Sequence, residues 1–120
     1  MTTMGRKRAS TALNEELFPI VGWAGLGGDM VRPETARDMR KAGFTVNFGD
    51  PGSRDPIEIL DIHHKAGLRM IFNHPTLHVD DNLVLNPKRR KAVETLVRRI
   101  KDHPALYMYG LRDEPRLKTL

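Results

Sequence analysis

The chain has 120 residues, of which 39% are hydrophobic and 29% charged, and its formal net charge is +5. This composition is typical of one soluble globular domain with a modest core, and it excludes a disordered tail. The absence of cysteine excludes disulfide frameworks and thiolate metal sites. No apolar run is long enough to cross a bilayer, so we expect no membrane partner.

The first 17 residues mix Thr, Ser, Lys, Arg and Glu without a sustained period, which predicts a flexible N-terminal arm. Its basic residues, Arg6, Lys7 and Arg8, are not followed by the apolar stretch of a secretory signal. With neither a signal nor a membrane span, we expect a cytoplasmic location by default.

Four short apolar runs follow, each bounded by turn residues, at positions 18–24, 44–49, 68–73 and 105–111. Three segments of helical period separate them and begin near Pro33, Pro56 and Pro87, each a residue suited to a first helical turn. Strands that alternate with helices in this way predict an α/β fold with a parallel sheet. We therefore expect one domain from residue 18 to residue 120.

Local signals mark where the helices begin and end. Asp55 is placed to cap the second helix, and Glu58 is placed to reach back to the cap amide. Gly43 and Gly67 follow two similar segments, Lys-Ala-Gly-Phe and Lys-Ala-Gly-Leu, and both are predicted to take a left-handed capping conformation. Asn86 opens the third helix, whose apolar stripe is formed by Ala92, Val93, Leu96, Val97 and Ile100.

Four parallel strands joined by right-handed crossovers form either half of a (β/α)8 TIM barrel or a small open sheet. Several candidate binding residues fall at or near the carboxyl ends of their strands, namely Trp23, Asn47, Asn73, His74, Asp113 and Glu114. In a barrel those ends share one face, where active sites are built. The sequence therefore favours half a barrel, because a complete one needs roughly 250 residues.

The chain resembles the first half of the clan A glycoside hydrolases, and most closely their beta-galactosidase-like members. The resemblance covers about residues 18–115. It rests on Ile-Val-Gly-Trp at 20–23, the two Lys-Ala-Gly segments at 41–44 and 65–68, His-Pro-Ala-Leu at 103–106, and Tyr-Gly-Leu-Arg-Asp-Glu-Pro at 109–115. It implies a barrel fold, hydrolysis of O-glycosyl bonds, a carbohydrate substrate and no cofactor.

In that family the fourth strand ends in Asn-Glu-Pro, and the glutamate donates the proton to the glycosidic oxygen. By position, Glu114 is the acid/base that the resemblance implies, and Asp113 replaces the asparagine. An ionised aspartate only accepts hydrogen bonds, whereas asparagine also donates them. The second catalytic glutamate of the family lies on the seventh strand, so we expect this chain to be inactive without a C-terminal half-barrel.

The remaining strand-end residues are candidates for sugar binding. Trp23 offers an aromatic face on which a pyranose ring can stack. Asn47, Asn73 and His74 offer hydrogen-bonding groups for sugar hydroxyls. For each of them the ordinary alternative is structural: core packing for the tryptophan, and a loop or cap contact for the others.

Two other classes of function stay open. A divalent metal site would use His74, His78, Asp80, Asp81 and Glu114, although their spacing matches no compact ligand motif. A non-catalytic half-barrel would instead pair with a second copy, because four strands without closure leave two free edges.

Three further signals receive ordinary interpretations. Nucleic-acid binding is not expected, because no aromatic residues interleave the basic clusters at 6–8 and 88–91. The glycine-rich segment at 25–28 is interpreted as a barrel loop, since it lacks a complete phosphate-binding fingerprint. His63 and His64 are expected on the surface of the second helix.

Overall fold

The computed structural model describes residues 18–80 and 83–113. Its four strands form one parallel sheet in the order β1-β2-β3-β4. The strands are β1 (Val21–Gly22), β2 (Val46–Gly49), β3 (Arg69–Asn73) and β4 (Leu106–Gly110). The expected α/β fold with four parallel strands is confirmed, and the first strand is shorter than the run at 18–24 suggested. The arm at 1–17 and the candidate acid Glu114 lie outside the described residues.

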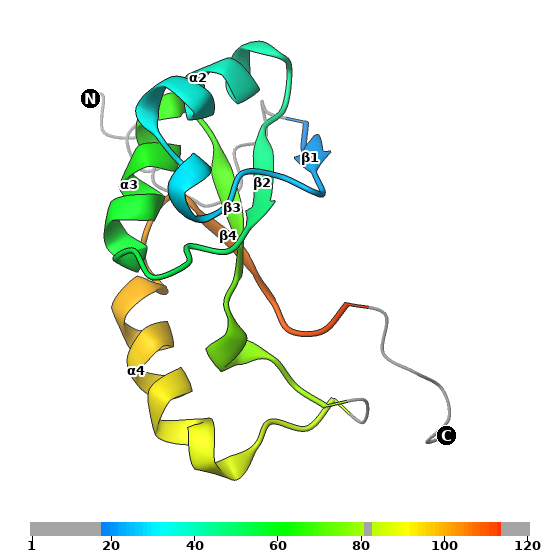
Figure 1. The fold of residues 1–120 in the computed structure, drawn as a ribbon, viewed down its shortest axis with the longest axis vertical. Helices are drawn as coiled ribbons and strands as arrows, with labels where there is room; N and C mark the ends of the chain where they lie inside the picture. Colours follow the sequence, from blue (N-terminus) through cyan, green and yellow to red (C-terminus); the bar gives the residue numbers. More distant parts are fainter. Residues whose placement is uncertain (1–17, 81–82, 114–120) are drawn as a thin grey trace, which may run out of the picture.

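Within residues 18–80 and 83–113, three α-helices connect the strands, with short 3-10 turns before or between them (Figure 1). They are α2 (Pro33–Lys41), α3 (Pro56–Ala66) and α4 (Arg90–Ile100), and the turns are η1 (Gly28–Met30), η2 (Pro75–Leu77) and η3 (Pro87–Arg89). Within the described part of the chain, no helix has the length and apolar character needed to cross a membrane.

The strand order explains why the helices lie along one side of the sheet in Figure 1. Right-handed crossovers between strands that always advance in the same direction place every helix on the same face. A doubly wound sheet would reverse its order and carry helices on both faces. The arrangement is consistent with half of a (β/α)8 barrel, and the described sheet is not closed.

The core lies between the sheet and the helices. Met70 and Phe72 of β3 are fully buried against Ile59 and Leu60 of α3. From α4, Ile100 joins them, and Val93, Leu96 and Val97 pack around the same cluster. Ala92 is exposed, so the predicted stripe is correct except for this residue at its edge.

The two Lys-Ala-Gly segments end their helices in the same way. After α3, Gly67 has φ +83°, its amide bonds to His64 O, and the amide of Leu68 bonds to His63 O. After α2, Gly43 has φ +106° and makes the same pair of bonds together with Phe44, to Arg40 O and Met39 O. This is the Schellman motif, in which a left-handed residue lets the chain satisfy the last carbonyls.

The start of α3 corrects one prediction. Asp55 precedes the helix, but its side chain accepts no capping hydrogen bond from the backbone. The carboxylate instead pairs with Arg99 of α4, at 2.6 Å, and Glu58 pairs with Arg54 at 3.4 Å. Because these guanidinium groups lie within reach, both carboxylates bind a cation rather than the backbone, and the Asp55 pair links α3 to α4.

Replacement of Gly67 by alanine is expected to destabilise the fold by about 1–2 kcal/mol, the cost of a left-handed conformation for a residue with a Cβ atom. The nearest atom to that Cβ would be Arg40 Nε at 3.5 Å, an ordinary contact, so the effect isolates backbone strain. Urea denaturation of Gly67→Ala measures the loss. Lys65→Ala, at an exposed position of the same helix, is the control, and equal stability of the two variants would contradict the prediction.

Candidate functional site

One face of the sheet carries no described helix, and a groove lies on it. Successive side chains of a strand point to opposite faces, so Ile71 and Asn73 point away from the core that holds Met70 and Phe72. An irregularity after Met70 shifts the register, and Ile71 then pairs with Met108 of β4. Apolar side chains from neighbouring strands thus meet on this open face.

The groove has a volume of about 490 Å³ and is open to solvent. It is lined by Trp23, Phe48, Ile71, Asn73, His78, Met108, Tyr109, Gly110, Leu111, Arg112 and Asp113. Most of its polar members follow the carboxyl ends of β3 and β4. The groove is therefore apolar along the sheet and polar at the end where a barrel of this kind binds its ligands.

Two aromatic rings form one wall of the groove. The ring of Trp23, just after β1, stacks on that of Phe48 in β2, with centroids 4.4 Å apart and planes 10° from parallel. Trp23 remains 59% exposed, so its outer face stays in contact with solvent. A flat aromatic surface of this kind matches the apolar face of a sugar ring.

The absence of a side chain at Gly110 keeps the groove open between its walls. A Cβ atom at this position would lie 3.2 Å from Phe48 Cε1 and 3.4 Å from Asn73 Oδ1. Both contacts are tight, and a larger side chain would extend into the space beside them. Glycine at the end of β4 thus keeps open the space between the aromatic wall and the polar end of the groove.

Asn73 and His78 form a hydrogen-bonded pair at the polar end. The amide oxygen Oδ1 of Asn73 only accepts, so His78 Nε2 donates to it, at 2.9 Å. The loop that carries His78 is fixed by Arg89, whose guanidinium donates to the carbonyls of Pro75 and His78, at 2.6 Å each. Among the described groups, Asn73 Nδ2 has no hydrogen-bond acceptor, which leaves it able to donate to a ligand.

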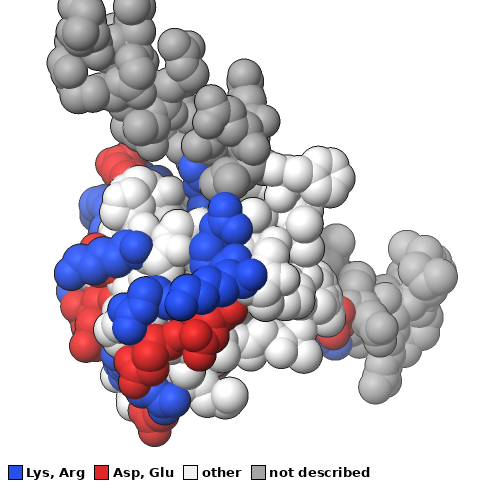
Figure 2. Space-filling model, turned by 90° about the horizontal axis from the view of Figure 1, so that it is seen from above, with Lys and Arg blue, Asp and Glu red and all other residues white. Residues whose placement is uncertain are grey.

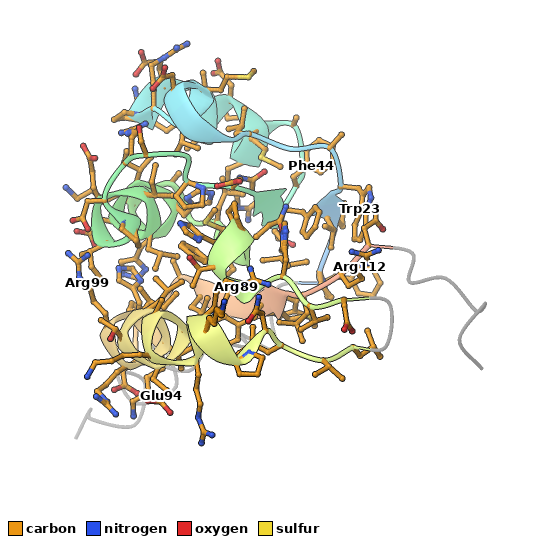
Figure 3. The ribbon with its side chains drawn as sticks, turned by 60° about the horizontal axis from the view of Figure 1, so that its bottom comes forward. Trp23, Phe44, Arg89, Glu94, Arg99 and Arg112 are labelled. Carbon is orange, nitrogen blue, oxygen red and sulfur yellow. The ribbon has the colours of Figure 1, made fainter. Side chains whose placement is uncertain are left out.

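Opposite charges stand side by side where β4 ends. Arg112 and Asp113 are both exposed and line the groove, and Arg112 reaches the carbonyl of Val79 at 3.5 Å. Figure 3 shows Arg112 near Trp23, on the side away from Arg99 and Glu94 of α4. Burial, with a smaller effect of Asp102, raises the pKa of Tyr109, so this residue stays a neutral phenol near pH 7.

Asn47 does not reach the groove, which corrects its assignment as a sugar ligand. Its side chain is fully buried on the helical face of the sheet, where it holds the loop after β1. Oδ1 accepts from Leu26 N at 2.8 Å, and Nδ2 donates to Leu26 O at 2.9 Å. A side chain at Gly25 would overlap Asn47 Oδ1, which explains a glycine in this loop without a phosphate.

The same amide also fixes His63, which is fully buried rather than on the surface as expected. Because Asn47 Nδ2 is a donor, His63 Nε2 accepts from it, at 2.9 Å. The proton of the imidazole then sits on Nδ1, which donates to Ile59 O at 2.8 Å. Burial lowers the pKa of His63, opposed by the bond to Ile59 and assisted by the charge of His103, so the ring is neutral.

His74 is also placed away from the groove. Its Nδ1 accepts from Thr76 N at 3.1 Å and so caps η2, and its ring lies parallel to that of buried Phe72, with centroids 6.1 Å apart. These contacts put the imidazole on the helical side. The ordinary alternative considered for this residue, a cap contact, describes its role in the described structure.

Of the six strand-end candidates, the groove brings together Trp23, Asn73 and Asp113. The metal hypothesis gains no support, since the described residues include no cluster of three or more His, Asp or Glu side chains. Two of its proposed ligands, Asp81 and Glu114, lie outside the described residues.

The groove also contains residues that the sequence did not identify as sugar ligands, chiefly Phe48, His78, Gly110 and Arg112. Phe48 follows Asn47 directly, and successive side chains of a strand point to opposite faces of the sheet. The face that β2 turns towards the groove therefore decides which of the two residues lines it. The strands are apolar on both faces, and their sequence therefore gives no indication of that choice. The sequence placed His78 only in the metal hypothesis, and nothing in its loop indicates a sugar ligand.

Replacement of His63 by glutamine is expected to reduce the pH dependence of stability. A folded-state pKa below the ordinary 6.5 means that the unfolded chain binds the proton more readily. The free energy of unfolding of the wild type should therefore fall as the pH drops below about 6.5, by up to about 1.4 kcal/mol per pH unit. The free energy of unfolding of His63→Gln should not show this decrease at low pH, because glutamine does not titrate.

Urea denaturation at pH 7.5 and 5.5 measures the effect. His64→Gln, at the exposed neighbouring position, is the control and should keep the wild-type dependence. The same change with pH in His63→Gln as in the wild type would contradict the assignment of a neutral, buried imidazole.

Comparisons of the chain with protein-family models, with curated proteins and with solved structures gave no match. The resemblance to the glycoside hydrolases therefore rests on the short motifs of the sequence.

Proposed function

We propose that the groove binds a carbohydrate and that the chain is the N-terminal half of a glycoside hydrolase barrel. The observation that carries the proposal is the stacked pair Trp23 and Phe48, which lies beside polar groups near the carboxyl ends of the strands. An apolar plate next to convergent hydrogen-bonding groups is what a pyranose requires, because its ring faces are apolar and its edge carries hydroxyls.

The polar end offers complementary groups for those hydroxyls. Asn73 Nδ2 donates, and Asp113 accepts through its carboxylate. Arg112 is a further donor at the same end of the groove. A site with both donors and acceptors suits a hydroxyl, which requires one of each, better than it suits a simple anion.

The proposed chemistry assigns proton transfer to Glu114, the residue that follows Asp113 and the end of β4. A carboxylic acid at this position would protonate the glycosidic oxygen as the bond to the leaving group breaks. The carboxylate that remains would then remove a proton from water in the second step. A second carboxyl group is also needed for the retaining reaction, about 5–5.5 Å from the first, and the proposal assigns it to a C-terminal half-barrel.

Replacement of Trp23 by alanine is expected to weaken sugar binding by about tenfold, because the stacking surface is lost. Isothermal titration of the chain with p-nitrophenyl β-galactoside, followed by other aryl glycosides, measures the dissociation constants. Phe18→Ala removes an aromatic ring that is 78% exposed and does not line the groove, so it is the matched control. Equal affinities of Trp23→Ala and Phe18→Ala would remove the aromatic wall from the site.

Replacement of Glu114 by glutamine is expected to lower glycoside hydrolysis by about 10²–10⁴-fold, the usual contribution of a general acid. The assay uses the chain together with any coding sequence that continues in frame after Leu120. Glu94→Gln, at an exposed position of α4, is the control and should keep full turnover. Undiminished turnover in Glu114→Gln would exclude this residue from the mechanism.

A further inference from the structure

We infer that two copies of this chain pair through the open face of the sheet and close one eight-stranded barrel. The open face is defined by Phe48, Ile71 and Met108, with Trp23 and Leu111 at its margin. The inference does not depend on carbohydrate binding, and it is the alternative to closure of the barrel by a C-terminal half.

The first observation is the exposure of apolar side chains on this face. Trp23, Met108 and Leu111 are 59%, 50% and 48% exposed. Parallel sheets are found almost only with both faces covered, and here the described helices cover one. Ile71, which lies between them on the sheet, is 9% exposed, so the exposed apolar surface is formed by the side chains around it.

The second observation concerns the edges of the same sheet and identifies what covers it. In the described sheet β1 and β4 are the edge strands, since β1 pairs only with β2 and β4 only with β3. Edge strands present backbone groups that pair with another chain. A helix or a peptide on the open face would leave at least one edge unpaired, whereas a second parallel sheet can cover the face and pair with both edges.

A second copy of this chain has the required geometry. A two-fold axis parallel to the strands keeps all strands in one direction and places β4 of each copy beside β1 of the other. The strand order then continues around a ring of eight. Eight strands give the barrel whose interior is filled by side chains, so Phe48, Ile71 and Met108 of both copies would form its core.

The distribution of charge permits this pairing although each copy has a net charge of +5. Figure 2 shows the Lys, Arg, Asp and Glu side chains gathered over the helical side of the molecule. Among the described residues that line the groove, the charged ones are Arg112 and Asp113, which carry opposite charges and follow the end of β4.

Light scattering coupled to size exclusion tests the inference on the 120-residue chain. The wild type should have twice the monomer mass of 13.6 kDa at micromolar concentration. Met108→Lys and Leu111→Lys each place a charge in the interface, and each should raise the dissociation constant of the dimer by at least about 30-fold. Both side chains are about half exposed in one copy, so the folded monomer should tolerate lysine, as circular dichroism will verify.

Met30→Lys is the matched control, because Met30 is 58% exposed and lies on η1, outside the groove. It should stay dimeric. A wild-type chain that remains a folded monomer up to about 100 µM would overturn the inference, since a different occupant would then cover the face. Dimers equally weakened by Met30→Lys, or unaffected by both groove variants, would overturn it as well.

Discussion

The buried side-chain amide of Asn47 is the contact that holds together β2, the loop after β1 and helix α3. Through one side chain it joins β2 to both backbone groups of Leu26 and to the imidazole of His63 on α3. Each atom has a single possible role, because Leu26 fixes the orientation of the amide and the amide fixes the tautomer of the histidine. The loop that follows Trp23 is thereby tied to the sheet and to a helix at once, and the aromatic wall rests on that support.

The direction of the crossovers determines where any function can lie. Because the strand order never reverses, the described helices gather on one face and leave the other to Phe48, Ile71 and Met108. The groove and the free strand edges are two consequences of the same topology. The two proposals fill this face in different ways, because a C-terminal half-barrel would pair with the strand edges in a glycoside hydrolase and a second copy would pair with them in the 120-residue chain. The mass of that chain in solution therefore distinguishes the two.

The sequence predicted the helices and strands well, because the residues that begin and end them act through their immediate neighbours in the chain. Pro33 and Pro56 begin α2 and α3 as predicted, whereas Pro87 begins the 3-10 turn η3 and α4 starts at Arg90. The positive φ of Gly43 and Gly67 likewise depends on neighbours within one turn. The site was predicted less well because it depends on the face each strand presents. Asn47 and His74 were assigned to the ligand side and lie on the helical side, while Phe48 and His78 line the groove.

Polar side chains at strand ends therefore divide into two kinds, and burial on the helical face distinguishes them. The side-chain amide of Asn47 makes its hydrogen bonds to the backbone of Leu26 and to His63. It is therefore not free to bind a ligand, and its role is structural. Asn73 keeps an amide group directed to the open side, since its oxygen alone is used by His78. The two asparagines occupy similar places in sequence, each near the end of an apolar strand. The face of the sheet on which each asparagine lies, and not its residue type, separates the two. The hydrogen-bonding and stacking groups of the groove are therefore Asn73, Asp113 and the aromatic wall.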